Sequence, residues 1–177
     1  MVNQENLRSH IRNIPDFPKK GIVFRDITTL LKNAEAFISA IDLMVERYKT
    51  ERIAKVVSVE SRGFIFGSVL AYRLSAGFVP VRKPKKLPAE TLKEDYQLEY
   101  GFDSLEIHRD AIQQGERVLI VDDLLATGGT VEATTTLVKR LGGEIVSLAF
   151  LIELTFLHGR ERLSSFDVFS IVKYDSE

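Results

Sequence analysis

The segment from residue 117 to residue 130 restricts the fold of this chain more than any other. Four consecutive apolar residues, 118–121, are followed by Asp122 and Asp123, then by a run of small residues at 126–130, and then by a helical pattern. A short apolar run of mostly β-branched residues is typical of a strand buried in a parallel sheet. The segment therefore predicts a strand, a tight loop and a helix within an α/β domain.

The loop at 126–130 reads Ala-Thr-Gly-Gly-Thr and predicts an anion site. Backbone N–H groups and the positive end of the helix dipole converge at such a turn, which favours phosphate. Asp122 and Asp123 would repel a phosphate, so we expect them to contact sugar hydroxyls, a divalent cation or a cationic transition state. A generic strand-to-helix turn, the alternative, requires neither two acids nor so many small residues. No lysine follows the glycines, so the loop is not a Walker motif.

Composition limits the class of protein. The 177 residues suffice for one domain, expected to span 1–177, and the hydrophobic and charged fractions of 45% and 28% are ordinary for a globular protein. The net charge of −1 argues against a general nucleic-acid or membrane surface. Without cysteines there are no disulfides and no thiolate metal sites. The polar N-terminus and the lack of long apolar stretches predict a cytoplasmic protein.

The remaining periodicity predicts alternating strands and helices, and hence a central, mostly parallel sheet flanked by helices. Residues 14–21 and 24–26 are expected to be loops, because prolines and a glycine interrupt the first of these segments. The expected strands are 53–59, 78–81, 118–121, 145–152 and 168–172, and the expected helices are 3–12, 34–49, 63–75, 131–141 and 156–163.

The polar stretch from Lys83 to Tyr96 is too long for an ordinary connection and predicts a lid or binding loop. Residues 96–100 and 105–108 alternate and predict an antiparallel hairpin. Together they indicate a flexible hood over about residues 84–108, at the carboxyl ends of the strands, where ligands bind in such sheets.

Two further segments carry positive charge near those strand ends. Arg62 stands at a predicted helix start, which is unfavourable unless it faces an anion, and the alternative is an exposed arginine. Residues 82–86 read Arg-Lys-Pro-Lys-Lys and indicate phosphate contact or, alternatively, solvated surface. The histidines, His10, His108 and His158, show no metal-ligand spacing.

Several separate motifs in one order give the chain a family resemblance. Residues 118–130 resemble the phosphoribosyl-diphosphate (PRPP) motif of type I phosphoribosyltransferases, and the resemblance to adenine-specific members of this family covers about residues 12–163. The other segments that carry it are 15–18, 21–27, 61–64, 86–88, 98–101, 153–155 and 159–160. One departure is Lys85, where many members have glycine.

The resemblance implies the type I phosphoribosyltransferase fold and a reaction of purine salvage. Adenine would displace pyrophosphate from C1 of PRPP, giving AMP. Mg²⁺ would be the cofactor, held mainly by PRPP and water rather than directly by protein side chains. The partners implied are the small molecules adenine and PRPP and a second copy of the chain in a homodimer, with no nucleic acid and no membrane.

The resemblance also implies a role for particular residues. Asp122 and Asp123 would hold the ribose hydroxyls and stabilise positive charge at C1, and Glu99 would manage the proton on the purine as general acid/base. The 5′-phosphate would be bound by Ala126, Thr127, Gly128, Gly129 and Thr130. The pyrophosphate would be bound by Ser61, Arg62, Arg82, Lys83 and Lys86. Adenine would be bound by Val23, Phe24, Arg25, Leu124 and Leu154.

Two alternatives remain open at this point. The chain could be a phosphoribosyltransferase for another base, although the Leu-Glu-Tyr-Gly segment at 98–101 and the region of Phe24 speak against it. It could instead be a transcriptional regulator that keeps a PRPP-binding fold as a sensor. Such a regulator needs a nucleic-acid surface, which the net charge does not favour.

Overall fold

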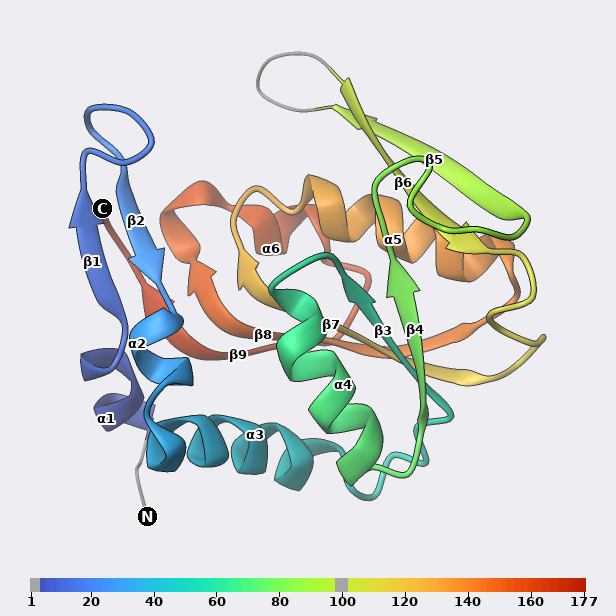
Figure 1. Ribbon diagram of the computed structural model, residues 1–177, viewed down its shortest axis with the longest axis horizontal. Helices are drawn as coiled ribbons and strands as arrows, with labels where there is room; N and C mark the ends of the chain where they lie inside the picture. The colour runs from blue at the N-terminus through green and yellow to red at the C-terminus, as the bar shows by residue number, and fades with distance from the viewer. Residues whose placement is uncertain (1–3, 98–101) are drawn as a thin grey trace.

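A five-stranded parallel sheet forms the centre of the computed structural model, which describes residues 4–97 and 102–177 (Figure 1). Neighbouring strands follow the order β4-β3-β7-β8-β9 and pair in parallel throughout. The strands are β3 (Lys55–Val59), β4 (Gly77–Val81), β7 (Arg117–Leu125), β8 (Glu144–Leu154) and β9 (Val168–Tyr174). The predicted α/β class with a parallel sheet is confirmed.

Successive side chains of a strand point to opposite faces of the sheet, and here the side chains on both faces are apolar. Helices therefore cover both faces. Leu119 and Val121 of β7 face a core shared with four helices, whereas Val118 and Ile120 face a core shared with α5. In Figure 1, α5 lies across the sheet from α3 and α4. The helices are α1 (Gln4–Ser9), α2 (Thr28–Leu31), α3 (Ala34–Tyr48), α4 (Gly63–Arg73) and α5 (Gly129–Arg140).

The expected boundary after residue 121 is wrong, because β7 continues to Leu125. Asp122 and Leu125 remain paired with Phe150 and Glu153 of β8. Strand pairing uses the backbone, so a carboxylate at the exposed end of a strand does not interrupt it. Both acids therefore stand on a fixed strand. The following helix begins at Gly129, earlier than the expected 131.

The expectation of loops at 14–21 and 24–26 is also wrong in part. β1 (Arg12–Pro15) pairs antiparallel with β2 (Val23–Asp26). Pro15 ends an edge strand, a position at which proline is tolerated. Asp26 fixes the base of this ribbon through an ion pair with Arg12, 2.5 Å between Nη2 and Oδ2.

The hairpin is confirmed but its register is not. β5 (Thr91–Gln97) pairs with β6 (Phe102–His108), whereas the alternation predicted a first strand at 96–100. Residues 98–101 lie outside the described part of the chain. One side of the hairpin faces solvent, so β5 is rich in polar residues and lacks the apolar run that marks a buried strand. The other side buries Leu92, Leu105 and Ile107 in the α5 core, so the base of the hood is anchored.

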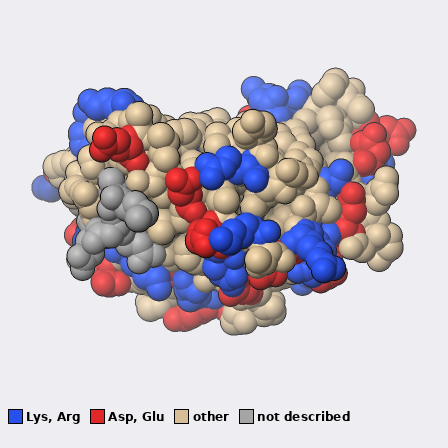
Figure 2. Space-filling model, turned by 90° about the horizontal axis from the view of Figure 1, so that it is seen from below, with Lys and Arg blue, Asp and Glu red and all other residues tan. Residues whose placement is uncertain are grey.

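The surface agrees with the small net charge. Figure 2 shows acidic and basic side chains interspersed over the face seen from below Figure 1. Within residues 4–97 and 102–177, no helix combines the length and the apolar character needed to cross a bilayer.

Candidate active site

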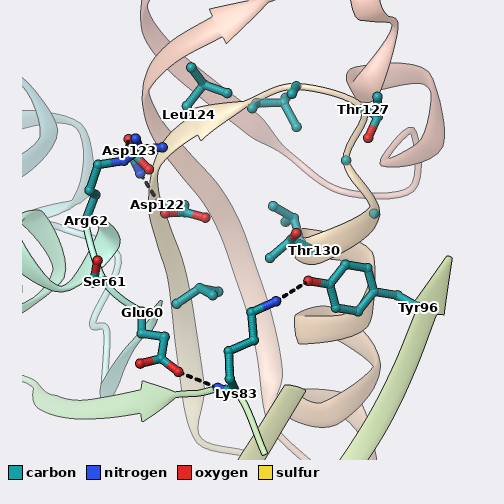
Figure 3. A pocket seen from close by; sticks show the side chains of 16 residues that line it. Glu60, Ser61, Arg62, Lys83, Tyr96, Asp122, Asp123, Leu124, Thr127 and Thr130 are labelled. Atoms are coloured by element: carbon teal, nitrogen blue, oxygen red, sulfur yellow. Dashed lines mark hydrogen bonds and ion pairs between the residues drawn. The ribbon is translucent and has the colours of Figure 1, made fainter. Parts of the chain in front are cut away.

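A cavity of about 410 Å³ opens where β3 and β7 end and α5 begins (Figure 3). It brings together segments that are far apart in the sequence, which is the position expected for a ligand in an open α/β sheet. Of the residues predicted for the site, those lining it are Ser61, Arg62, Lys83, Asp122, Asp123, Leu124, Ala126, Thr127, Gly128, Gly129 and Thr130.

The loop at 126–130 has the geometry of a phosphate cradle. Gly128 adopts φ +84°, a left-handed conformation that glycine tolerates, and directly precedes the 12-residue helix α5. The N–H groups of the first helical turn have no intrahelical acceptor and stand at the positive end of the dipole. Thr127 and Thr130 add hydroxyl groups along the same loop (Figure 3). The arrangement can bind a phosphate monoester without a lysine.

The carboxylate pair lies across the cavity from this loop. Asp122 is half-buried and Asp123 is buried, and Nε of Arg62 lies 2.6 Å from Oδ2 of Asp123. Burial and the neighbouring charge of Asp123 raise the pKa of Asp122 well above its ordinary value. Burial also raises the pKa of Asp123, although Arg62 opposes this shift. The pair therefore gains from any ligand that supplies hydrogen-bond donors or positive charge.

Replacing Asp122 with asparagine should stabilise the ligand-free protein and slow turnover. A raised folded-state pKa means that ionising Asp122 opposes folding. The ionised carboxylate does not destabilise the folded state below about pH 4, the pKa of an aspartate in the unfolded chain. Its full destabilising effect is reached above the raised pKa of the folded state. We expect Tm to rise above wild type at pH 7, by about 2–4 °C per kcal/mol in a domain of this size. kcat should fall about 10²–10³-fold, as when electrostatic stabilisation is removed.

Thermal scans between pH 4 and pH 8 with steady-state rates check this expectation. The Tm advantage should shrink as the pH falls toward 4. Asp110→Asn, at an exposed position outside the cavity, is the control and should change neither Tm nor kcat. A lower Tm for Asp122→Asn at pH 7 would contradict the electrostatic argument.

The basic segment is only partly directed into the cavity. Lys83 points inward, where Nζ lies 2.9 Å from the Tyr96 hydroxyl and pairs with Asp103. Arg82 turns instead to Glu60, with 2.9 Å between Nη2 and Oε2, and Lys86 is exposed. Neither Arg82 nor Lys86 lines the cavity.

Glu60 and Tyr96 line the cavity but were not predicted as site residues. Burial alone would raise the pKa of Glu60, but hydrogen bonds from the Lys83 N–H and from Arg82 outweigh it and lower the pKa. Glu60 thus ties the start of the basic segment to the end of β3. An acid directly after a strand was a usable signal for Glu60, whereas no local pattern marks Tyr96.

The residues predicted for adenine, apart from Leu124, lie outside this cavity's lining. Phe24 is nevertheless close, because the guanidinium carbon of Arg62 lies 5.4 Å from its ring centroid. The N–H of Val23 donates to Oε2 of Glu177 at 2.8 Å, and Arg25 donates to the Ser176 carbonyl at 3.0 Å. Figure 1 shows the C-terminus beside β1 and β2. Glu99 lies outside the described residues.

Residues 26–175 match the phosphoribosyl transferase domain family, and the chain belongs to this family. Individual relatives indicate which base the members most similar to this chain use. The adenine phosphoribosyltransferase of Acidobacterium capsulatum is 61% identical over 173 residues, which are 98% of this chain and 96% of that protein. The adenine phosphoribosyltransferase of Thermotoga maritima is 60% identical over 169 residues, or 96% of this chain and 98% of that protein.

Solved structures agree. The crystal structure of adenine phosphoribosyltransferase from Thermoanaerobacter pseudethanolicus has a TM-score of 0.94 at 55% identity, covering 97% of this chain and 100% of that one. The Saccharomyces cerevisiae enzyme, complexed with an imino-altritol bisphosphate and adenine, has a TM-score of 0.88 at 41% identity, covering 95% and 97%. Within its family the chain therefore belongs to the adenine phosphoribosyltransferases, pentosyltransferases of purine salvage.

Proposed function

We propose that this chain converts adenine and PRPP to AMP and pyrophosphate, and that the loop at 126–130 holds the 5′-phosphate. One observation carries the proposal: the N-terminal end of α5 and the Asp122–Asp123 pair face the same cavity. The loop offers donors to a phosphate, and the acids suit the ribose between that phosphate and the reacting carbon. A site with N–H donors at one end and carboxylates beside them matches a phosphorylated sugar with a leaving group at C1.

The two acids have a role that their electrostatics supports. Asp122 and Asp123 accept hydrogen bonds from the ribose 2′- and 3′-hydroxyls and stabilise the positive charge that develops at C1. The charge of Asp123 helps to raise the pKa of Asp122, so a ligand that brings hydrogen-bond donors relieves the repulsion between the two groups. Preorganised charges of this kind act mainly in the transition state.

Pyrophosphate binds beside them, on the side of Ser61, Arg62 and Lys83. These residues line the cavity, and Lys83 presents its ammonium group to it. Arg82 and Lys86 belong to the same basic segment and add positive charge from outside the cavity lining.

Mg²⁺ fits this donor set as a cation carried mainly by the substrate. Residues 4–97 and 102–177 contain no group of three side chains with metal-ligating geometry. Mg²⁺ commonly uses one or two carboxylates together with substrate phosphates and waters. Asp122 and Asp123 line the cavity and would assist in holding the ion, which when bound would supply charge neutralisation at the pyrophosphate.

Adenine lies against β2, between Phe24 and Leu154 and close to Leu124. The main chain of Val23 and Arg25 reads its edge: a carbonyl accepts from the exocyclic amine and an N–H donates to the adjacent ring nitrogen. Hypoxanthine presents the opposite pattern and leaves buried polar groups unpaired. The edge at Val23 is available to the base once Glu177 releases the N–H.

The chain acts in the cytoplasm as a homodimer. Ile65 and Tyr72 lie seven residues apart on α4 and so share one face, and Tyr72 is 84% exposed. Exposed apolar side chains on one helical face suit a second copy of the chain. Sedimentation of wild type and Tyr72→Lys tests this, and a wild-type monomer at micromolar concentration contradicts it.

Product formation tests the reaction directly. AMP should appear when adenine, PRPP and Mg²⁺ are all present, and hypoxanthine, guanine or orotate should not replace adenine. Preferred turnover of any of those three bases overturns the adenine assignment. Salt-sensitive binding to DNA or RNA without turnover would instead support the alternative that the chain is a transcriptional regulator.

Replacing Asp103 with asparagine should tighten PRPP binding. Asp103 forms an ion pair with Lys83 and so competes with the pyrophosphate group for that ammonium. Partly exposed pairs contribute about 0.2–1 kcal/mol, so KM for PRPP should fall about 1.5–5-fold. The control is Asp95→Asn on the same hairpin, where Asp95 pairs with Lys93 outside the cavity. A higher KM in Asp103→Asn alone would show that Asp103 positions Lys83 instead.

A further inference from the structure

The backbone at Gly159 lies directly against the loop at 126–130. A Cβ on Gly159 would stand 2.1 Å from the Ala126 carbonyl oxygen and 3.1 Å from the Gly128 nitrogen. Conversely, a Cβ on Gly128 would stand 2.9 Å from the Gly159 oxygen. Real Cβ atoms do not approach other atoms so closely, so the two backbones touch with no side chain between them.

An ion pair between the half-exposed Arg160 and the buried Glu153 fixes the segment that carries Gly159. This segment runs from a 3₁₀ turn (Thr155–Leu157) into α6 (Gly159–Arg162). Arg160 donates to both carboxylate oxygens of Glu153, at 2.8 and 2.5 Å, and to the Val168 carbonyl at 2.8 Å. Glu153 is only 3% exposed. A bidentate arginine of this kind fixes orientation as well as position.

The anchor and the loop are joined through the sheet. Glu153 of β8 pairs in register with Leu125 of β7, and Leu125 directly precedes the loop. Glu153 also accepts a hydrogen bond from the Ser170 hydroxyl on β9. The Glu153 backbone is thus paired with β7, and its carboxylate binds Ser170 on β9 and Arg160, the neighbour of Gly159. Neither Glu153 nor Arg160 lines the candidate active site, so direct contact with substrate does not explain the pair.

We propose that Gly159 and the Glu153–Arg160 pair are positioning residues for the 5′-phosphate. The inference rests on the proposed function, in which the loop at 126–130 binds that phosphate. A glycine-rich loop has much conformational freedom, and ordering it on binding costs free energy. A rigid backbone behind the loop removes that freedom in advance, so its N–H groups already converge before PRPP arrives.

Separate titrations of ribose 5-phosphate and pyrophosphate distinguish positioning from a purely structural role. In Gly159→Ala, the new Cβ must displace the loop, so affinity for ribose 5-phosphate should fall at least about tenfold. Affinity for pyrophosphate, which binds at the other end of the cavity, should stay within about twofold of wild type. Arg160→Lys keeps a cation but loses the bidentate contact. It should also weaken ribose 5-phosphate binding, by less than Gly159→Ala, and leave pyrophosphate binding unchanged.

Gly143→Ala is the control for added bulk at a packed glycine. Its Cβ would stand 2.8 Å from Cγ1 of Val138, a milder clash against a side chain, and Gly143 lies outside the cavity. It should lower Tm and leave both affinities unchanged. Equal losses for the two ligands, or an unchanged ribose 5-phosphate affinity in a folded Gly159→Ala, would overturn the inference. Wild type that binds no ribose 5-phosphate would overturn the proposed function, and the inference with it.

Discussion

PRPP binding should be lost when Gly128 is replaced with valine, while the protein stays folded. Gly128 holds φ at +84°, which a β-branched residue adopts only under strain of about 1–3 kcal/mol. The Cβ would also stand 2.9 Å from the Gly159 oxygen. The loop must therefore move, and its N–H groups no longer converge on the 5′-phosphate. Calorimetric titration with PRPP and Mg²⁺ should show affinity reduced more than about 10²-fold.

The chain supplies a matched control for backbone strain. Gly115 has φ +80°, but a Cβ there meets nothing within 4 Å. Gly115→Val should lower Tm through backbone strain alone, by less than Gly128→Val, and retain wild-type PRPP affinity. If calorimetry gave wild-type affinity for Gly128→Val as well, the loop would not be the phosphate site. Circular dichroism on both variants confirms that each is folded.

Glu99→Gln should lower kcat about 10²–10⁴-fold, the range for loss of general acid/base catalysis. The proposed role is transfer of the proton on the purine ring as the bond to C1 forms. Glutamine keeps the size of the side chain but cannot exchange a proton at neutral pH. PRPP affinity should be largely retained, because the phosphate loop is untouched.

The last described residue of β5 lies close to the loop at 126–130. Gln97, the last described residue of β5, has its carbonyl oxygen 3.5 Å from the position of a Cβ on Gly129. The strand that leads toward Glu99 therefore ends against the phosphate loop. Glu94→Gln on the same strand is the control and should retain kcat, since Glu94 pairs with Arg140 outside the cavity. An unchanged kcat in Glu99→Gln removes Glu99 from the mechanism.

Much of the site could be predicted because its chemistry is local. Asp122, Asp123 and the loop at 126–130 lie within nine consecutive residues that end one strand and begin one helix. Such a segment has few possible geometries, so residue type and order determine where the anion binds. Arg62 also lies between a strand and a helix, which made it a candidate, whereas Ser61 was predicted only through the family resemblance.

Residues that act through distant partners were not predictable. Tyr96 enters the cavity only because β5 packs against α5, and Arg82 turns to Glu60 rather than inward. The register of β5 and β6 and the β1–β2 ribbon were likewise mispredicted, because polar edge strands lack the apolar pattern that marks buried ones.

The sequence by itself determined the parallel sheet, the strand, loop and helix around residues 117–130, and the family, since each depends on residue order within short segments. Only the tertiary structure decided that Gly159 lies behind that loop and that Lys83 meets Asp103. The physical reason is that a contact between distant segments depends on how whole strands and helices pack. Neither its distance nor its partner is encoded in the local pattern around either residue.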